Sequence, residues 1–390
     1  MKKTAGLIAL ILSISFIPQL TISCSKVQAA SITDKSKIEL VFALDTTGSM
    51  SGLIEAAKDK IWSIANTMAT AKPTPEIKIG IVGYRDRGDA YVTTITGMTD
   101  DLDLVYQKLM AFAAQGGGDG PESVNQALYD AVHKISWSRS GKKTYKVIFL
   151  VGDAPPHMDY QNDVKYQKTC KEASKKGIVI NTIQCGNMSR TRQVWEEIAS
   201  LSDGKYFRVS QGGDSTDYKT PFDTEIAEKS KALHGTKVYY GDKKFHRKNR
   251  SKLDAVNEIY SKAKPSAIAK RSSYNMSSSG KKNLLGEQEL VDSVTSGQIK
   301  LEDIKEDELP LEMQKMSLSD RKIHIQVKEK ERKQISAELR TLAEKRQTYI
   351  RAIVSKEKDK GKNSLDMKIY ECIQKQAVDK GIEYKETLKY

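Results

Sequence analysis

The sequence contains few of the residues on which the commonest catalytic and metal centres depend. It has 5 histidines and 4 cysteines among 390 residues. No Cys-x-x-Cys pair occurs, which leaves a zinc or thioredoxin-like site without support. The Gly-x-Ser-x-Gly motif of serine hydrolases and the Gly-x-x-x-x-Gly-Lys-Ser/Thr loop of nucleotide-binding proteins are absent as well. The sequence therefore gives no basis for a Ser-His-Asp hydrolase or for ATP hydrolysis.

Apolar residues are scarce for a compact protein, at 38% of the chain against 29% charged residues. This balance predicts one well-packed domain and a polar, helix-rich remainder. The formal net charge is +14. Residues 229–390 hold 37 Lys+Arg and 24 Asp+Glu, a net charge of +13, which leaves +1 for the first 228 residues. The C-terminal excess predicts either a weak contact with anionic surfaces or a solvated helical face.

Long hydrophobic runs are missing except at the N-terminus. Lys2 and Lys3 precede an apolar run over residues 5–20, and small residues at 27–29 resemble a cleavage site. The run is short for a membrane span, so it predicts a signal peptide over residues 1–30, with an uncleaved anchor as the alternative. We expect an exported bacterial protein, periplasmic or secreted.

Export would permit two cysteine modifications. Cys24 lies in the signal region, where lipid attachment is the less favoured alternative because Thr21 stands at a position where lipoproteins carry Leu. Cys170 and Cys185 flank an expected helix-to-strand connection and could form a disulfide. The spacing alone does not decide this pairing.

Strand and helix patterns alternate in the first half of the chain. Apolar runs predict strands over residues 38–44, 77–84, 94–98, 146–151, 178–183 and 205–209, and helical stripes fall over residues 52–71, 101–112, 122–137, 163–176 and 192–201. This alternation predicts an α/β fold, a Rossmann-like doubly wound, mostly parallel sheet with helices on both faces. Ligands bind such sheets at the C-terminal ends of strands, where Asp45 and Asp153 lie.

The pattern changes after residue 211. We expect a basic linker over residues 212–283, with one helix at 221–233, followed by a charged helical region over residues 284–390. In that region a long helix is expected from Ser317 to about Lys356. Its apolar stripe spans fewer than three heptads, so a helical hairpin and a short coiled coil both remain open.

Asp45-Thr46-Thr47-Gly48-Ser49 places a carboxylate and two hydroxyls at alternate positions directly after an apolar strand. A turn at this point can direct all three side chains into one cavity. Mg²⁺ prefers about six oxygen ligands and retains some of its waters. One carboxylate and two hydroxyls leave such an ion short of negative charge, so a carboxylate from a partner would complete its shell.

The motif resembles the metal-ion-dependent adhesion site, or MIDAS, of von Willebrand factor type A (VWA) domains, Asp-x-Ser-x-Ser, with Thr47 in place of the first Ser. The family's second element is a loop Thr. The similar stretch here, residues 116–122, has none, so either Asp119 or a water takes its place. Asp153 matches the third, acidic element. The resemblance covers about residues 37–211 and implies the metal ligands Asp45, Thr47, Ser49, Asp119 and Asp153.

The resemblance implies a binding module rather than an enzyme. We expect Mg²⁺, with Mn²⁺ or Ca²⁺ as alternatives, and a protein or cell-envelope partner that carries an acidic group. No specific nucleic-acid partner is expected. A metal-dependent phosphatase or other hydrolase is the second hypothesis, because an Asp at a strand end can accept a phosphoryl group. Thr47 stands where the phosphatase pattern has a second Asp, which weighs against it. Metal-independent binding of anionic surfaces by the basic helical region is the third.

Overall fold

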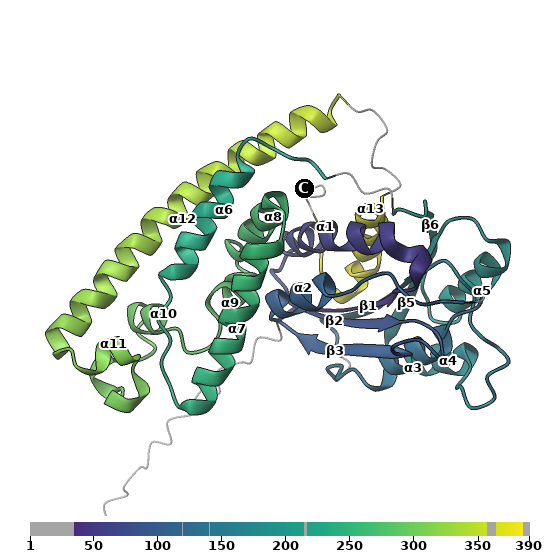
Figure 1. The fold of residues 1–390 in the computed structure, drawn as a ribbon, viewed down its shortest axis with the longest axis horizontal. Helices are drawn as coiled ribbons and strands as arrows, with labels where there is room; N and C mark the ends of the chain where they lie inside the picture. Colours follow the sequence, from purple (N-terminus) through teal and green to yellow (C-terminus); the bar gives the residue numbers. More distant parts are fainter. Residues whose placement is uncertain (1–34, 119, 140, 214–216, 357–363, 385–390) are drawn as a thin grey trace, which may run out of the picture. The chain divides into compact units, whose positions relative to one another are not determined.

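Six strands form the central sheet of the computed structural model, which describes residues 35–118, 120–139, 141–213, 217–356 and 364–384 (Figure 1). The strand order is β3-β2-β1-β4-β5-β6. The strands are β1 (Lys37–Asp45), β2 (Glu76–Tyr84), β3 (Thr93–Thr99), β4 (Thr144–Gly152), β5 (Ile178–Cys185) and β6 (Tyr206–Val209). All neighbours are parallel except β2 and β3. The predicted Rossmann-like sheet is confirmed, and the predicted signal peptide with Cys24 lies outside the described residues.

The register of the sheet places the ends of its central strands together. In β1, Asp45 lies beside Tyr84 of β2, and Leu44 lies beside Val151 of β4. Strand β4 is buried along its whole length, and β1 is buried from its second residue. Buried, mostly apolar strands of this kind suit a sheet covered on both sides. The chain turns that follow β1 and β4 therefore meet at one edge.

Each face of the sheet carries its own apolar core. Helices α1 (Ser51–Met68), α2 (Leu102–Met110) and α13 (Leu365–Gln376) cover one face. Helices α3 (Val124–His133), α4 (Tyr166–Lys175) and α5 (Ser189–Ser200) cover the other. In the described part of the chain, no helix combines the length and hydropathy that a membrane crossing requires.

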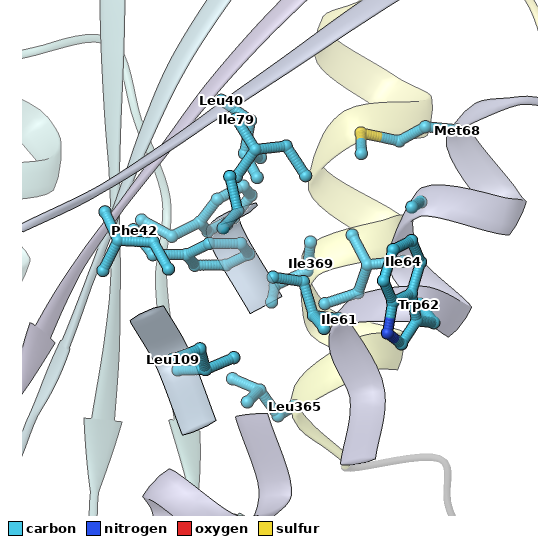
Figure 2. Packing of buried hydrophobic residues seen from close by; sticks show 14 of the residues in the cluster. Leu40, Phe42, Ile61, Trp62, Ile64, Met68, Ile79, Leu109, Leu365 and Ile369 are labelled. Atoms are coloured by element: carbon cyan, nitrogen blue, oxygen red, sulfur yellow. The ribbon is translucent and has the colours of Figure 1, made fainter. Parts of the chain in front are cut away.

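The C-terminal helix α13 completes the core of the sheet, although the predicted domain ended at residue 211. Leu365 and Ile369 lie among Phe42, Ile61 and Leu109 (Figure 2). The side chain of Gln376 accepts hydrogen bonds from Tyr145 in β4 at 2.6 Å and from Asn181 in β5 at 3.0 Å. The core of the sheet therefore includes α13, which lies beyond the predicted domain boundary at residue 211.

The segment predicted as a basic linker is helical and packed. It contains α6 (Asp223–Gly235), α7 (Lys243–Lys262), α8 (Pro265–Asn275) and the start of α9 (Lys281–Leu285). Several of its cations are buried in ion pairs, such as Lys270 with Asp217 and Arg271 with Asp103. The prediction failed because a buried cation looks like a solvent-facing residue in a hydropathy pattern.

The predicted long helix is confirmed as α12 (Leu318–Val354), where Ser317 accepts a hydrogen bond from the backbone N–H of Asp320 at 3.2 Å. Its stripe packs on α6 and α8 of the same chain rather than on the single long partner helix of a coiled coil. Arg346 in this stripe is 2% exposed and donates to Asp223 at 2.8 Å. Helices α10 (Leu290–Thr295) and α11 (Leu311–Gln314) form a smaller core with the start of α12.

Cys170 and Cys185 lie in the cores on opposite faces of the sheet and are not joined by a disulfide. Cys170 belongs to α4, and Cys185 ends β5. The sheet between them excludes the pairing that the sequence left open.

Truncation of Ile369 tests whether α13 belongs to the sheet domain. Ile369 is fully buried, so we expect Ile369→Ala to lower the free energy of unfolding by about 2–5 kcal/mol. Val378→Ala is the matched control, because Val378 is 51% exposed and should change stability by less than about 0.5 kcal/mol. Urea denaturation followed by circular dichroism measures both. Equal, small changes would show that α13 does not stabilise the domain.

Candidate functional site

The loop after β1 gathers the first three predicted ligands. Asp45 is buried, and its Oδ1 accepts hydrogen bonds from the Thr47 backbone N–H at 2.9 Å and from Thr47 Oγ1 at 2.6 Å. The hydroxyl oxygens of Thr47 and Ser49 are 3.5 Å apart. Thr47 is buried and Ser49 is exposed. The carboxylate therefore lies at the bottom of the site, and Ser49 lies at its surface.

Asp153 joins the same cluster from the end of β4. Its Oδ2 accepts a hydrogen bond from Gln211 Nε2 at 2.7 Å, and the same Nε2 donates to the backbone oxygen of Ser49 at 3.2 Å. The Thr191 hydroxyl donates to the backbone oxygen of Asp153 at 2.8 Å, which holds this turn against α5. Four of the five predicted ligands therefore lie together, while Asp119 lies outside the described residues. Sequence reasoning missed Gln211, which has no motif.

Glu122 is a further acidic residue at this edge. A Cβ atom on Gly117 would lie 3.1 Å from Glu122 Oε1 and 3.3 Å from the Thr47 Cβ atom, so the Glu122 carboxyl faces the Thr47 side of the site. The backbone of Glu122 is fixed by a hydrogen bond from its N–H to Pro155 O at 2.9 Å. Its position at the end of the glycine-rich stretch was the available sequence signal.

Asp89 holds the glycine-rich loop beside the site. Its Oδ2 accepts hydrogen bonds from the backbone N–H groups of Gly117 at 3.0 Å and Asp86 at 3.1 Å. Gly116 and Gly117 have φ angles of 79° and 75°, which glycine adopts without strain. Asp89 thus links the loop after β2 to the loop that faces Thr47.

The neighbouring His157 and Asp86 stabilise loops. His157 Nδ1 lies 2.8 Å from Asp159 Oδ1, and its ring stacks on Tyr160 with centroids 4.1 Å apart. Asp86 accepts hydrogen bonds from the hydroxyls of Ser123 at 2.8 Å and Tyr160 at 2.7 Å. These contacts fix the turns after β2 and β4.

The carboxyls of Asp45 and Glu122 are buried beside other acidic groups. Burial raises the pKa of Asp45 to about 7, although hydrogen bonds from Thr47 act in the opposite direction. Burial and the nearby charges of Asp45 and Asp86 raise the pKa of Glu122 to about 9. Asp45 Oδ2 and Glu122 Oε2 are buried without a hydrogen-bond partner among the described residues. Such oxygens fit a bound cation, because an unpaired buried carboxylate is costly.

A cation at this position would depend on mixed ligands. Within the described ranges, no three His, Cys, Asp or Glu side chains are grouped so that they could hold a metal ion by themselves. The carboxylates of Asp45 and Asp153 and the hydroxyls of Thr47 and Ser49 are oxygen donors at this position. Oxygen donors of this kind suit Mg²⁺, which also keeps waters.

Substitution of Gly152 tests how closely Asp45 is packed. A Cβ atom on Gly152 would lie 2.9 Å from the Asp45 Cβ atom and would also clash with the Tyr84 hydroxyl. We expect Gly152→Ala to lower the free energy of unfolding by about 1–3 kcal/mol, because the packed strands leave no room. Gly97→Ala in β3 is the control, since open space surrounds that position. Thermal denaturation measures both, and an equally small effect would contradict this packing.

Comparisons with known proteins agree with the fold. Residues 39–216 match the family model of the von Willebrand factor A domain. Among curated relatives, a von Willebrand factor A domain-containing protein 7 of Rattus norvegicus is 39% identical over 89 residues, which cover 23% of this chain and 9% of that protein. A putative ariadne-like RING finger protein of Acanthamoeba polyphaga mimivirus is 24% identical over 32% of this chain and 12% of its own length.

The match spans less than a fifth of the length of either curated relative, so both relatives are much longer than the matched region. Among solved structures, the SpRpn10 VWA domain has a TM-score of 0.34 and 19% identity, with 45% of this chain and 87% of that chain covered. The family match and the strand order agree on one domain. Over residues 39–216 the chain therefore resembles a von Willebrand factor A domain.

Proposed function

We propose that this chain is a binding protein whose VWA domain holds one divalent cation, Mg²⁺ or, alternatively, Mn²⁺ or Ca²⁺, and uses it to attach a protein or cell-envelope partner. VWA domains commonly mediate protein–protein interactions. The observation that carries the proposal is the Asp45 carboxylate, whose Oδ2 is buried without a hydrogen-bond partner among the described residues, beside the Thr47 hydroxyl.

The residues around Asp45 would divide the work of holding the cation. Asp45 and Asp153 would supply negative charge, while Thr47 and Ser49 would supply neutral oxygens. Thr47 already fixes Asp45 Oδ1 through two hydrogen bonds, which leaves Oδ2 for the cation. A bound cation supplies an electrophilic point to which an acidic group of the partner attaches.

Gln211 would hold Asp153 in place before the partner arrives. Its amide lies between Asp153 Oδ2 and the backbone oxygen of Ser49, and its side chain is exposed at the surface of the site. Ser49 is exposed as well, so the surface side of the site is open to a partner's carboxylate.

Binding is favoured over catalysis by the arrangement around Asp45. A phosphoryl-accepting Asp needs a nearby acid or base to assist the leaving group. His157 is engaged with Asp159 and Tyr160, and Asp86 is engaged with Ser123 and Tyr160. Hydrolysis of p-nitrophenyl phosphate that depends on Asp45 would instead select the phosphatase hypothesis.

Direct titration with a cation tests the proposal. We expect isothermal titration of the chain, after treatment with a chelator, to show one site for Mg²⁺ or Mn²⁺. The paramagnetic signal of Mn²⁺ provides a second readout of the bound fraction. Mn²⁺ bound by Asp153→Asn as tightly as by the unaltered chain would contradict the proposed ligand set. Absence of binding for all three cations would contradict the proposed function.

A further inference from the structure

The first half of α7 has an unusual charge pattern. The ten residues from Lys243 to Lys252, KKFHRKNRSK, contain six Lys or Arg residues and no acid. Cations near the N-terminus of a helix are unfavourable because the helix dipole is positive there. Asp242 caps the helix, accepting hydrogen bonds from the backbone N–H groups of Lys244 at 2.8 Å and Phe245 at 3.1 Å.

Two of the six cations attach α7 to its surroundings. Lys252 is buried and forms ion pairs with Asp101 at 2.7 Å and Asp103 at 3.4 Å, both next to or in α2. Lys248 forms an ion pair with Glu287 at 2.8 Å. These contacts pair the buried Lys252 and the exposed Lys248 with acidic residues of neighbouring segments.

The other four cations, which we name the α7 strip, are Lys243, Lys244, Arg247 and Arg250. All four are exposed, and none has an ion-pair partner within the ranges that the structure describes. Lys243, Arg247 and Arg250 are four and three residues apart, so they lie on one face of the helix. They extend over about 10 Å of helix axis. Like charges at this spacing repel one another, which makes the strip unfavourable for the isolated helix.

The chemistry of this face indicates the kind of partner. The strip lies on a convex helix, so its cations are spread along a line rather than converging on one small anion. The aromatic residue among them, Phe245, is partly buried. Membrane insertion and base stacking use exposed apolar or aromatic side chains, which the strip does not contain. Asp254, one turn further on, is exposed and acidic, and limits the strip to the first half of α7.

We propose that the α7 strip binds a linear polymer of repeating phosphate groups through charge alone. Contacts between the four cations and successive phosphates would release the polymer's counterions, which gives such binding its strength and its salt dependence. The site lies in a different part of the chain from the cluster of Asp45 and Asp153, and its binding requires no divalent cation.

The probe is end-labelled inorganic polyphosphate, and binding is followed by fluorescence anisotropy between about 50 mM and about 200 mM salt. The test variant replaces Lys243, Arg247 and Arg250 by Gln. We expect this variant to bind polyphosphate at least about tenfold more weakly than the unaltered chain. The slope of log affinity against log salt should become shallower by about 2. Binding by the unaltered chain should survive a chelator, and free inorganic phosphate should not compete at equal phosphate concentration.

A control variant on α12 separates the strip from the overall charge of the chain. Lys330, Arg340 and Lys345 are exposed, and their replacement by Gln removes the same three charges. We expect this control to bind nearly as well as the unaltered chain, with melting temperatures of both variants unchanged. Equal losses in the two variants, no binding of polyphosphate at low salt, or binding only to phosphatidylglycerol vesicles would each overturn the proposal.

Discussion

Replacement of Asp103 by Asn should lower the free energy of unfolding by about 3–5 kcal/mol, the loss expected when one partner of a buried ion pair is removed. Asp103 in α2 is fully buried. It accepts hydrogen bonds from Arg271 Nε at 2.6 Å and Nη2 at 2.8 Å, and Arg271 in α8 is 1% exposed. Without Asp103, this guanidinium would remain buried and unpaired. The pair therefore joins the helical segment 223–275 to the sheet domain.

Asp59→Asn is the matched control, because Asp59 and Lys264 join the same two parts of the chain at the surface. Their ion pair is 2.9 Å long, but the Lys264 side chain is 51% exposed. Surface pairs contribute about 0.2–1 kcal/mol. Urea denaturation should therefore separate the two variants clearly. Similar losses in both would show that the Asp103 pair is not what joins the helical segment to the domain.

The Asp103 effect should also depend on pH in a defined direction. Burial alone would raise the pKa of Asp103, but the attraction of Arg271 and Lys252 outweighs it and holds the pKa well below its usual range. An unfolded Asp has a pKa of about 3.9. The contribution of Asp103 is therefore fully present above about pH 5 and declines as the pH falls below about 4. The difference in free energy of unfolding between the unaltered chain and Asp103→Asn should therefore become smaller in acid.

Replacement of Asp45 by Asn should abolish binding of the divalent cation while leaving the fold intact. An Asn side chain keeps the oxygen that accepts hydrogen bonds from Thr47 and loses the charge on the atom that has no hydrogen-bond partner in the described structure. Without cation, the variant should be at least as stable as the unaltered chain, because a buried unpaired carboxylate is costly. Calorimetric titration and urea denaturation measure the two effects.

The sign of this stability change separates the cation site from a purely structural role of Asp45. If Asp45 only held its turn through the hydrogen bonds from Thr47, the substitution would change stability equally with and without cation. Asp303→Asn is the control, because Asp303 is exposed and far along the chain from the site. Two results together would favour the structural role. The Asp45→Asn chain would be less stable than the unaltered chain, and Mg²⁺ would change the stability of neither chain.

Local patterns were sufficient to predict the sheet and the placement of Asp45 and Asp153 at the ends of neighbouring strands. The strand-ending positions of Asp45 and Asp153 follow from apolar runs, and parallel strands bring such ends to one edge. Gln211 and Glu122 could not be assigned in the same way, because their positions depend on how loops return to the site. No periodic pattern encodes the hydrogen bond from Gln211 to Asp153.

The errors beyond residue 211 have a common physical cause. Ile369 packs in the sheet core, although helices α6 to α12 lie between β6 and α13 along the chain. Lys270 and Arg271 looked like solvent-facing linker residues, but both are buried in ion pairs with distant carboxylates. Hydropathy records the cost of burying a charge and contains no information about a partner elsewhere in the sequence.

The most direct test of the central claim is thermal unfolding of the chain with millimolar Mg²⁺ and with a chelator, carried out in parallel on Asp153→Ala. A ligand that binds the folded chain alone stabilises it by about 2.7 kcal/mol at one hundred times its dissociation constant. We therefore expect Mg²⁺ to raise the melting temperature of the unaltered chain and to leave that of Asp153→Ala unchanged. An unaltered chain whose melting temperature does not change with Mg²⁺, Mn²⁺ or Ca²⁺ would contradict the claim that this domain uses a divalent cation.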